Sequence, residues 1–307
     1  MGGVLQGFAV IGSLIALGAI LAQVGVLGGD SARMLSRLVF FVATPCLLIT
    51  LLADADVVHV LSTTLLVSAL PVVIVACVYA FVARLWWKRD GGHTMVGVLC
   101  SAYVNAGNLG IPIAVYALGD ASAIAPMLLL QLLVFSPIAL SVLDTIARGH
   151  RFAPHRMVLS VVRNPITLAA LGGLALAALD LELPAFVGQP VELLAGMAVP
   201  GMLLAYGVSL RLGPRIGTGG SAAEVATICA LKLVVQPLLA YLLGRFAFGL
   251  EGNALLSLTI IAALPTAQNI FVYATRYERS PLLARDTIAF TTALSVPVLL
   301  GIAAVLN

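Results

Sequence analysis

Long apolar runs constrain the fold of this 307-residue chain more than any other feature of its sequence. A helix needs about 20 residues to cross the hydrocarbon core of a bilayer. Hydrophobic residues make up 61% of the chain and charged residues 9%, against roughly 25% charged residues in a soluble domain. The sequence therefore predicts an all-α polytopic membrane protein. Its apolar runs predict ten transmembrane helices, at approximately residues 5–27, 34–53, 60–84, 95–118, 123–146, 164–180, 190–210, 222–246, 253–275 and 286–306.

The basic residues predict the orientation of these spans. Fourteen of the sixteen Lys and Arg residues lie in the first, third, fifth, seventh and ninth connections, whereas Arg245 lies in an even one and Lys232 within the eighth span. Under the positive-inside rule, the odd connections face the cytoplasm and both termini face away from it. The first basic residue is Arg33, so the N-terminal run lacks the charged start of a signal peptide and is expected to remain as a span. The expected location is the cell (inner or plasma) membrane.

Two polar, helix-breaking segments interrupt the fourth and ninth spans, one from Asn105 to Pro112 and the other from Pro265 to Asn269. Freed backbone groups are tolerated at membrane depth only where protein or a water-filled cavity covers them. Paired breaks near the midplane indicate a substrate site built from discontinuous helices. An alternative is a pair of proline kinks that Asn105 and Asn269 satisfy locally, without any ligand. The candidate substrate-binding residues are Asn105, Asn108, Thr266, Gln268, Asn269 and Lys232, and the candidate crossover or hinge residues are Gly107, Gly110, Pro112 and Pro265.

The breaks and several prolines recur in the two halves of the chain at a nearly constant offset. Pro45 matches Pro200 at an offset of 155, Asn108 matches Asn269 at 161, and Pro137 matches Pro297 at 160. We predict a repeat of five spans in residues 1–146 and 164–307, joined by a cytoplasmic loop at 147–163. Because five is odd, the second copy is inverted in the membrane, as in many secondary transporters.

Lys232 is the one cation well within a predicted span, at roughly 15 Å from its cytoplasmic end. Its ammonium could attract an anionic substrate, bridge the two breaks by bonding carbonyls, or snorkel to the surface. Asp144 and Glu224 lie near cytoplasmic span ends and are expected to be solvated. Since no Asp or Glu lies near the midplane, a proton relay is not indicated. Any coupling would need Na⁺ held by amide, hydroxyl and backbone oxygens, or there would be no coupling.

Three motifs carry a family resemblance: the run Phe41-Val-Ala-Thr-Pro45, the triplet Arg163-Asn164-Pro165, and the ninth-span run from Leu264 to Tyr273 followed by Arg276-Tyr277. They resemble the bacterial branch of the auxin efflux carrier family, which includes proteins described as malate or malonate permeases. The resemblance implies ten helices with broken, crossing helices 4 and 9. It also implies a scaffold of the first, second, sixth and seventh helices, an elevator-like transport domain and a homodimer. One departure is Val104-Asn105, where the plant carriers have Pro-Asn.

We expect a secondary transporter of small organic anions, such as mono- or dicarboxylates, that works by alternating access. The alternatives are a Na⁺-coupled symporter of a bulkier amphipathic anion, similar to the bile-acid transporters, and a membrane ligand sensor that does not transport. An enzyme is not expected, because no catalytic His, Asp pair or activated Ser lies at depth. The four His residues have no metal-binding spacing. Neither a metal, a cofactor nor a nucleic acid partner is predicted.

Overall fold

The structure is built from α-helices that are interrupted by short π-helical turns and by two extended breaks. The computed structural model describes residues 2–53, 63–148, 165–213 and 221–306. Within these ranges, the only extended pairing is one antiparallel bridge between Val104 and Thr266. The all-α class is therefore confirmed. The predicted loop at 147–163 lies, beyond Arg148, outside the described residues.

The helices of the two halves follow one another in a similar order. The first half contains α1 (Gly2–Gln23), α2 (Gly29–Leu38), α3 (Thr44–Ala53), α5 (Thr63–Phe81), α6 (Gly91–Ala102), α7 (Ile111–Ile113), α8 (Ala125–Leu130) and α9 (Ser136–Arg148). The second half contains α11 (Pro165–Ala178), α12 (Ala185–Gly196), α13 (Ala198–Leu212), α14 (Ala222–Ala230), α15 (Gln236–Leu242), α16 (Gly252–Ala262), α17 (Asn269–Arg276) and α18 (Pro281–Leu306). Short turns join or extend them: η1 (Val39–Ala43), η2 (Val82–Trp86), η3 (Ala106–Gly110), η4 (Ala114–Leu118), η5 (Ala121–Ile124), η6 (Gln131–Phe135), η7 (Leu231–Val235) and η8 (Leu243–Ala247).

Several of these helices are long and apolar enough to cross a membrane. Among the described residues, five helical stretches meet this criterion, namely Gly29–Ala53, Leu65–Trp86, Ala185–Leu212, Ala222–Ala247 and Pro281–Leu306. Five shorter apolar helices accompany them, namely Gly12–Gln23, Ala106–Leu118, Ser136–Ile146, Leu168–Ala178 and Gly252–Ala262. The chain is thus an all-helical, multi-pass membrane protein.

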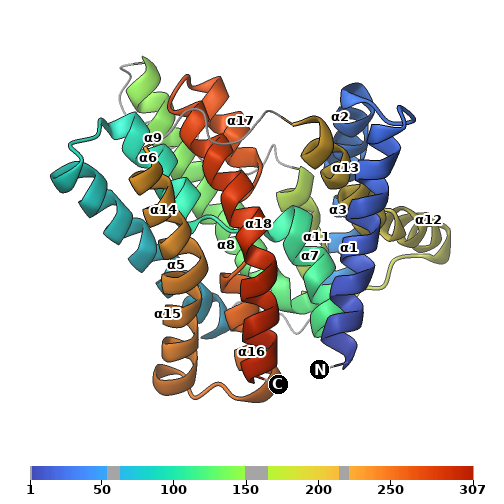
Figure 1. Cartoon of the computed structure of the whole chain (residues 1–307). Coiled ribbons are helices and arrows are strands. Elements are labelled where there is room, and N and C mark those ends of the chain that lie inside the picture. The colour runs from blue at the N-terminus through green and yellow to red at the C-terminus, as the bar shows by residue number, and fades with distance from the viewer. Residues whose placement is uncertain (1, 54–62, 149–164, 214–220, 307) are drawn as a thin grey trace.

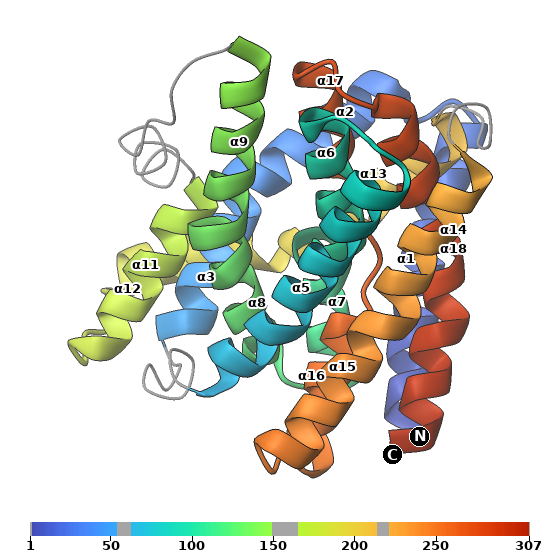
Figure 2. The same ribbon diagram turned by 90° about the vertical axis from the view of Figure 1, so that its left-hand side faces the viewer.

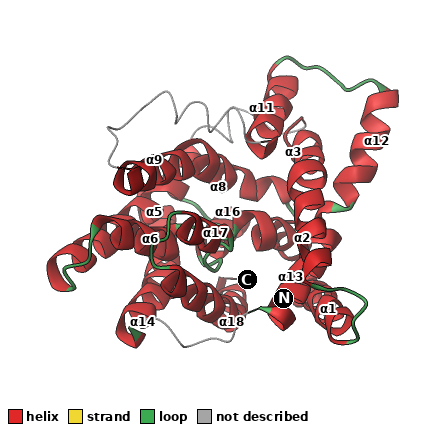
Figure 3. Cartoon of the chain, turned by 90° about the horizontal axis from the view of Figure 1, so that it is seen from above, coloured by secondary structure: helices red, strands yellow, loops and turns green. Residues whose placement is uncertain are grey.

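The helices form two groups, which are separated most clearly in the view from above (Figure 3). The small bundle consists of α1, α2, α3, α11, α12 and α13, in which α1 packs on α13 and α11 packs on α3. The large bundle consists of α5, α6, α8, α9 and α14 to α18 (Figures 1 and 2). The helical stretch 106–118 lies between them and contacts α1 and α13. Helices α1 and α18 place both chain ends at the same end of the molecule (Figure 1).

Glycine allows α1 and α13 to approach closely in the small bundle. A Cβ atom on Gly207 would lie 2.0 Å from the carbonyl oxygen of Ile15, and one on Gly18 would lie 2.4 Å from that of Leu204. Small residues at helix contacts are the usual way to gain packing energy in lipid, where apolar burial between helices contributes little. The small bundle is therefore a tightly packed unit.

The outer surface of the large bundle carries large apolar side chains. Phe81, Leu85 and Trp86 at the end of α5 and in η2 are 64%, 63% and 81% exposed. Soluble proteins rarely expose such contiguous apolar surface, whereas lipid accommodates it. Trp86 lies two residues before the exposed Lys88, which is the arrangement of an interfacial anchor.

Candidate functional site

The two helix breaks meet directly inside the molecule. The first separates α6 from η3 at residues 103–105, and the second separates α16 from α17. The N–H of Asn105 donates a hydrogen bond to the carbonyl of Pro265 over 2.8 Å, and the N–H of Ala267 donates to that of Tyr103 over 3.4 Å. The breaks therefore cross as a short antiparallel pair, which satisfies backbone groups that lipid could not.

Side chains from neighbouring elements complete this pairing. The hydroxyl of Thr266 donates to the carbonyl of Cys100 over 2.6 Å, and the amide of Gln131 donates to the carbonyl of Val104 over 2.9 Å. The hydroxyl of Thr291 accepts the N–H of Thr266 over 3.2 Å. Thr266 is fully buried and is itself part of the crossover, through its bridge with Val104. Its observed contacts hold the two breaks together.

A cavity of about 530 Å³ lies between the crossover and the small bundle. Ligand sites commonly have roughly 300–1,000 Å³. The crossover lines one side of it and α2, η1 and α13 line the other. The lining residues are Arg37, Val39, Phe40, Phe41, Thr44, Tyr103, Val104, Asn105, Gly107, Asn108, Leu128, Gln131, Leu132, Met202, Ala205, Tyr206, Ala267, Gln268 and Asn269.

Five of the residues predicted from sequence line this cavity, and amide groups dominate them. Asn105 accepts the N–H of Asn108 with its side-chain oxygen over 3.2 Å, and the amide of Asn108 donates to Oε1 of Gln268 over 3.3 Å. The amide of Asn269 donates to the hydroxyl of Tyr273 over 3.2 Å. Gly107 also lines the cavity. These contacts join the two breaks through their side chains as well as their backbones.

Asn105 carries a buried hydrogen-bond donor that none of the described residues accepts. The residue is 2% exposed, and its Nδ2 is buried without a hydrogen-bond partner among the described residues. A buried unsatisfied donor costs about 1–3 kcal/mol, which a ligand acceptor in the cavity would recover. Asn105 also caps the N-terminus of the helical stretch 106–118, where free N–H groups and the helix dipole favour an anion.

The other predicted hinge residues lie outside the cavity lining. A Cβ atom on Gly110 would lie 2.8 Å from Cδ1 of Ile124 and 2.9 Å from Cδ1 of Leu264, so this glycine permits close packing of the two breaks. Pro112 is buried at the start of α7. Pro265 contributes its carbonyl to the crossover.

Lys232 lies apart from the cavity, deep in the large bundle. Its Nζ donates to Oε1 of Gln236 over 2.7 Å and to the carbonyl of Ala262 over 3.2 Å. The side chain is 0% exposed. Snorkelling, one of the roles considered from the sequence, is therefore wrong. Carbonyl bonding, another of those roles, agrees with the observed contacts.

The part of the cavity wall that the small bundle supplies was not predicted from the sequence. This wall includes Arg37 of α2, Thr44 of α3 and Tyr206 of α13. These residues are distant in the sequence from the crossover residues that line the same cavity. Thr44 and Phe41 belong to the Phe41–Pro45 motif of the family resemblance, which is the feature of the sequence that could have pointed to this part of the cavity wall. Phe41 lies in the π-helical turn η1, which ends directly before Thr44, and π turns often accompany functional sites.

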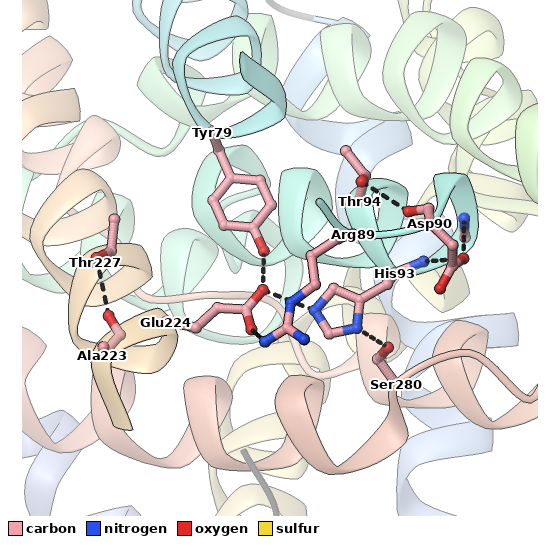
Figure 4. Close-up of polar contacts among 10 residues, drawn as sticks. Tyr79, Arg89, Asp90, His93, Thr94, Ala223, Glu224, Thr227 and Ser280 are labelled. Carbon is pink, nitrogen blue, oxygen red and sulfur yellow. Dashed lines mark hydrogen bonds and ion pairs between the residues drawn. The ribbon is translucent and has the colours of Figure 1, made fainter. Parts of the chain in front are cut away.

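A second polar cluster, around Glu224, lies between α5, α6 and α14 (Figure 4). The carboxylate accepts hydrogen bonds from the hydroxyl of Tyr79, from Nη2 of Arg89 and from Nε2 of His93, each over 2.7 Å. On the other side of its ring, Nδ1 of His93 lies 2.7 Å from Oγ of Ser280. Glu224 is 1% exposed, so the prediction that it is solvated is wrong.

Asp90 fixes the helix end from which His93 extends into this cluster. Its carboxylate caps α6 by accepting the N–H groups of Gly92 and His93 over 2.8 and 3.1 Å. The hydrogen bond from the His93 backbone, helped by the one from Gly92, holds the pKa of Asp90 below its usual range. A rigid, charged N-cap therefore sets the start of the broken helix.

Comparison with known proteins identifies the family. The model of the membrane transport protein family matches residues 8–151 and 149–303, one stretch in each half of the chain. A putative malonate transporter of Rhizobium meliloti is 28% identical over 299 residues, which cover 94% of this chain and 91% of that protein. An uncharacterized transporter of Methanothermobacter thermautotrophicus is 28% identical over 292 residues, 92% of each chain.

The plant carriers match about half of the chain. Auxin efflux carrier component 1 of Arabidopsis thaliana is 27% identical over 144 residues, which cover 46% of this chain and 23% of that protein. The resemblance inferred from the three motifs is confirmed, and the protein is a transporter and not an enzyme. The chain belongs to the membrane transport protein family, the family of the auxin efflux carriers.

Proposed function

We propose that this protein is a secondary transporter of small organic anions, such as mono- or dicarboxylates, and that the cavity at the crossover is its substrate site. The observation that carries the proposal is the buried Nδ2 of Asn105, a residue that lines this cavity, because Nδ2 has no hydrogen-bond partner among the residues that the structure describes. Asn108, Gln268 and Asn269 place further amides around the same space. Carboxylate oxygens are suitable acceptors for such donors.

The charge around the cavity supports an anion. The described residues that line it include no Asp or Glu, and the basic residue Arg37 belongs to its small-bundle wall. The helical stretch 106–118 and α17 both begin at the cavity, and the positive ends of half-helices attract anionic substrates in transporters. The putative malonate transporter among the relatives agrees with a small carboxylate.

The two bundles support alternating access by an elevator-type movement. In this proposal, the small bundle is the scaffold, and the large bundle carries the crossover and the bound anion across the membrane. We further propose ten transmembrane helices in a 5+5 inverted repeat, with repeats at 1–146 and 164–307. The family resemblance adds a homodimer in the cell membrane to the proposal.

Both termini are predicted to face away from the cytoplasm, because fourteen of the sixteen basic residues lie in odd connections. Alkaline phosphatase fused after Asn307 should be active, and green fluorescent protein fused there should remain dark after export. A fluorescent fusion with inactive phosphatase would contradict the ten-span topology.

Uptake by reconstituted protein tests the proposed function. Liposomes that contain the purified protein should accumulate labelled malonate in a saturable way, and unlabelled mono- and dicarboxylates should compete. Malonamide, which has the same shape but no charge, should not compete. A protein that takes up malonamide as well as malonate, or takes up neither, would contradict anion selectivity.

A further inference from the structure

The ammonium of Lys232 lies where the two broken helices end. Lys232 belongs to η7 in the middle of the helical stretch Ala222–Ala247. One of its hydrogen bonds goes directly to the carbonyl of Ala262, which is the last residue of α16. Its second hydrogen bond goes to Oε1 of Gln236. Nε2 of the same Gln236 amide donates to the carbonyl of Ala102, the last residue of α6, so the amide links Lys232 to that helix end.

Both helix ends attract positive charge. The last carbonyls of a helix lack intrahelical partners, and its dipole places about half a negative charge there. In transporters built from discontinuous helices, such C-terminal ends and unwound carbonyls coordinate a coupling Na⁺ or H⁺. Here, two such ends converge on one buried ammonium group.

The environment of Lys232 fits a cation held by dipoles. Lys232 and Gln236 are both 0% exposed. In the part of the chain that the structure describes, the hydrogen-bond partners of Lys232 are an amide and a carbonyl, not a carboxylate. Burying a charge costs several kcal/mol unless it is compensated, and the two helix ends are the groups that compensate it.

We propose that Lys232 is a tethered cation that permanently fills the cation site formed by the C-terminal ends of α6 and α16. Transport by this chain then needs no Na⁺ at that position, a consequence that rests on the proposed transport function. Each broken helix consists of two half-helices: α6 with the stretch 106–118, and α16 with α17. The N-terminal ends of 106–118 and α17 face the substrate cavity, whereas the C-terminal ends of α6 and α16 face Lys232. Removing the ammonium should convert the position into a site for a free cation.

The test compares the thermal unfolding of purified protein in NaCl and in N-methylglucamine chloride. Lys232→Met removes the charge at similar size, Lys232→Gln retains a hydrogen-bond donor, and Lys232→Arg retains the charge. Lys88→Met is the matched control, because Lys88 is exposed. We expect a lower melting temperature for the Met and Gln variants and a saturable upward shift with Na⁺. Wild type, Lys232→Arg and Lys88→Met should show no Na⁺ shift.

Two results would overturn the proposal. One is a saturable Na⁺ shift in wild type, since the site would then be open to a free cation. The other is a Lys232→Met protein that is insensitive to Na⁺, whether or not it is less stable than wild type. If neither uncharged variant can be purified, a saturable Na⁺ shift in wild type would still overturn the proposal. Because unfolding requires no substrate, this result is independent of whether malonate is transported. Malonate uptake by wild type should also be equal in the two salts.

Discussion

Asn105→Asp is expected to reduce malonate binding more than a hundredfold while leaving the protein folded. The substitution retains the side-chain oxygen that accepts the N–H of Asn108, and Asp is as good an N-cap as Asn. It replaces the unused donor by a negative charge inside the cavity. Two like charges 4 Å apart repel by roughly 4 kcal/mol at an effective dielectric constant of 20, in addition to about 1–3 kcal/mol for the lost donor.

The measurement is equilibrium binding of labelled malonate to purified protein. Asn253→Asp is the matched control, because it makes the same chemical change at an exposed asparagine on α16. The control should bind malonate like wild type. Undiminished binding by Asn105→Asp would mean that the cavity at the crossover does not hold the anion.

Glu224→Ala is expected to cost about 3–5 kcal/mol of stability, since breaking a buried charged network leaves its partners unsatisfied. The hydroxyl of Tyr79 is fully buried and has Glu224 as its acceptor. Arg89 and His93 would lose the same carboxylate. This loss should appear as a lower melting temperature in detergent.

Glu251→Ala is the control for Glu224, because Glu251 forms an ion pair with Arg245 that is largely exposed. Surface pairs contribute about 0–1 kcal/mol, so this variant should unfold close to wild type. Equal stability of the Glu224 and Glu251 variants would show that the cluster in Figure 4 contributes little to the fold.

The sequence predicted features that depend on local pattern. The helix breaks at Asn105 and Pro265 lie where they were expected, because a bilayer penalises Gly, Pro and Asn unless protein covers the backbone they free. The meeting of the two breaks followed from their similar depth, and the bridge between Val104 and Thr266 confirms it.

What the sequence could not predict depends on contacts between distant residues. Arg37 and Tyr206 line the cavity only because α2 and α13 pack beside the crossover. The sequence around Gln131 does not predict that its amide donates to the carbonyl of Val104, which is 27 residues away. Glu224 lies near a helix end and resembles any solvated residue there. Its partners Tyr79, Arg89 and His93 approach it from more than a hundred residues away.

Uptake of labelled malonate into liposomes that contain wild type or Asn105→Asp tests most directly whether the cavity at the crossover carries an organic anion across the membrane. We expect saturable uptake by wild type and uptake by Asn105→Asp at the level of empty liposomes, with equal amounts of folded protein in both. Equal uptake by the two proteins, or wild-type uptake no greater than that of empty liposomes, would contradict this expectation.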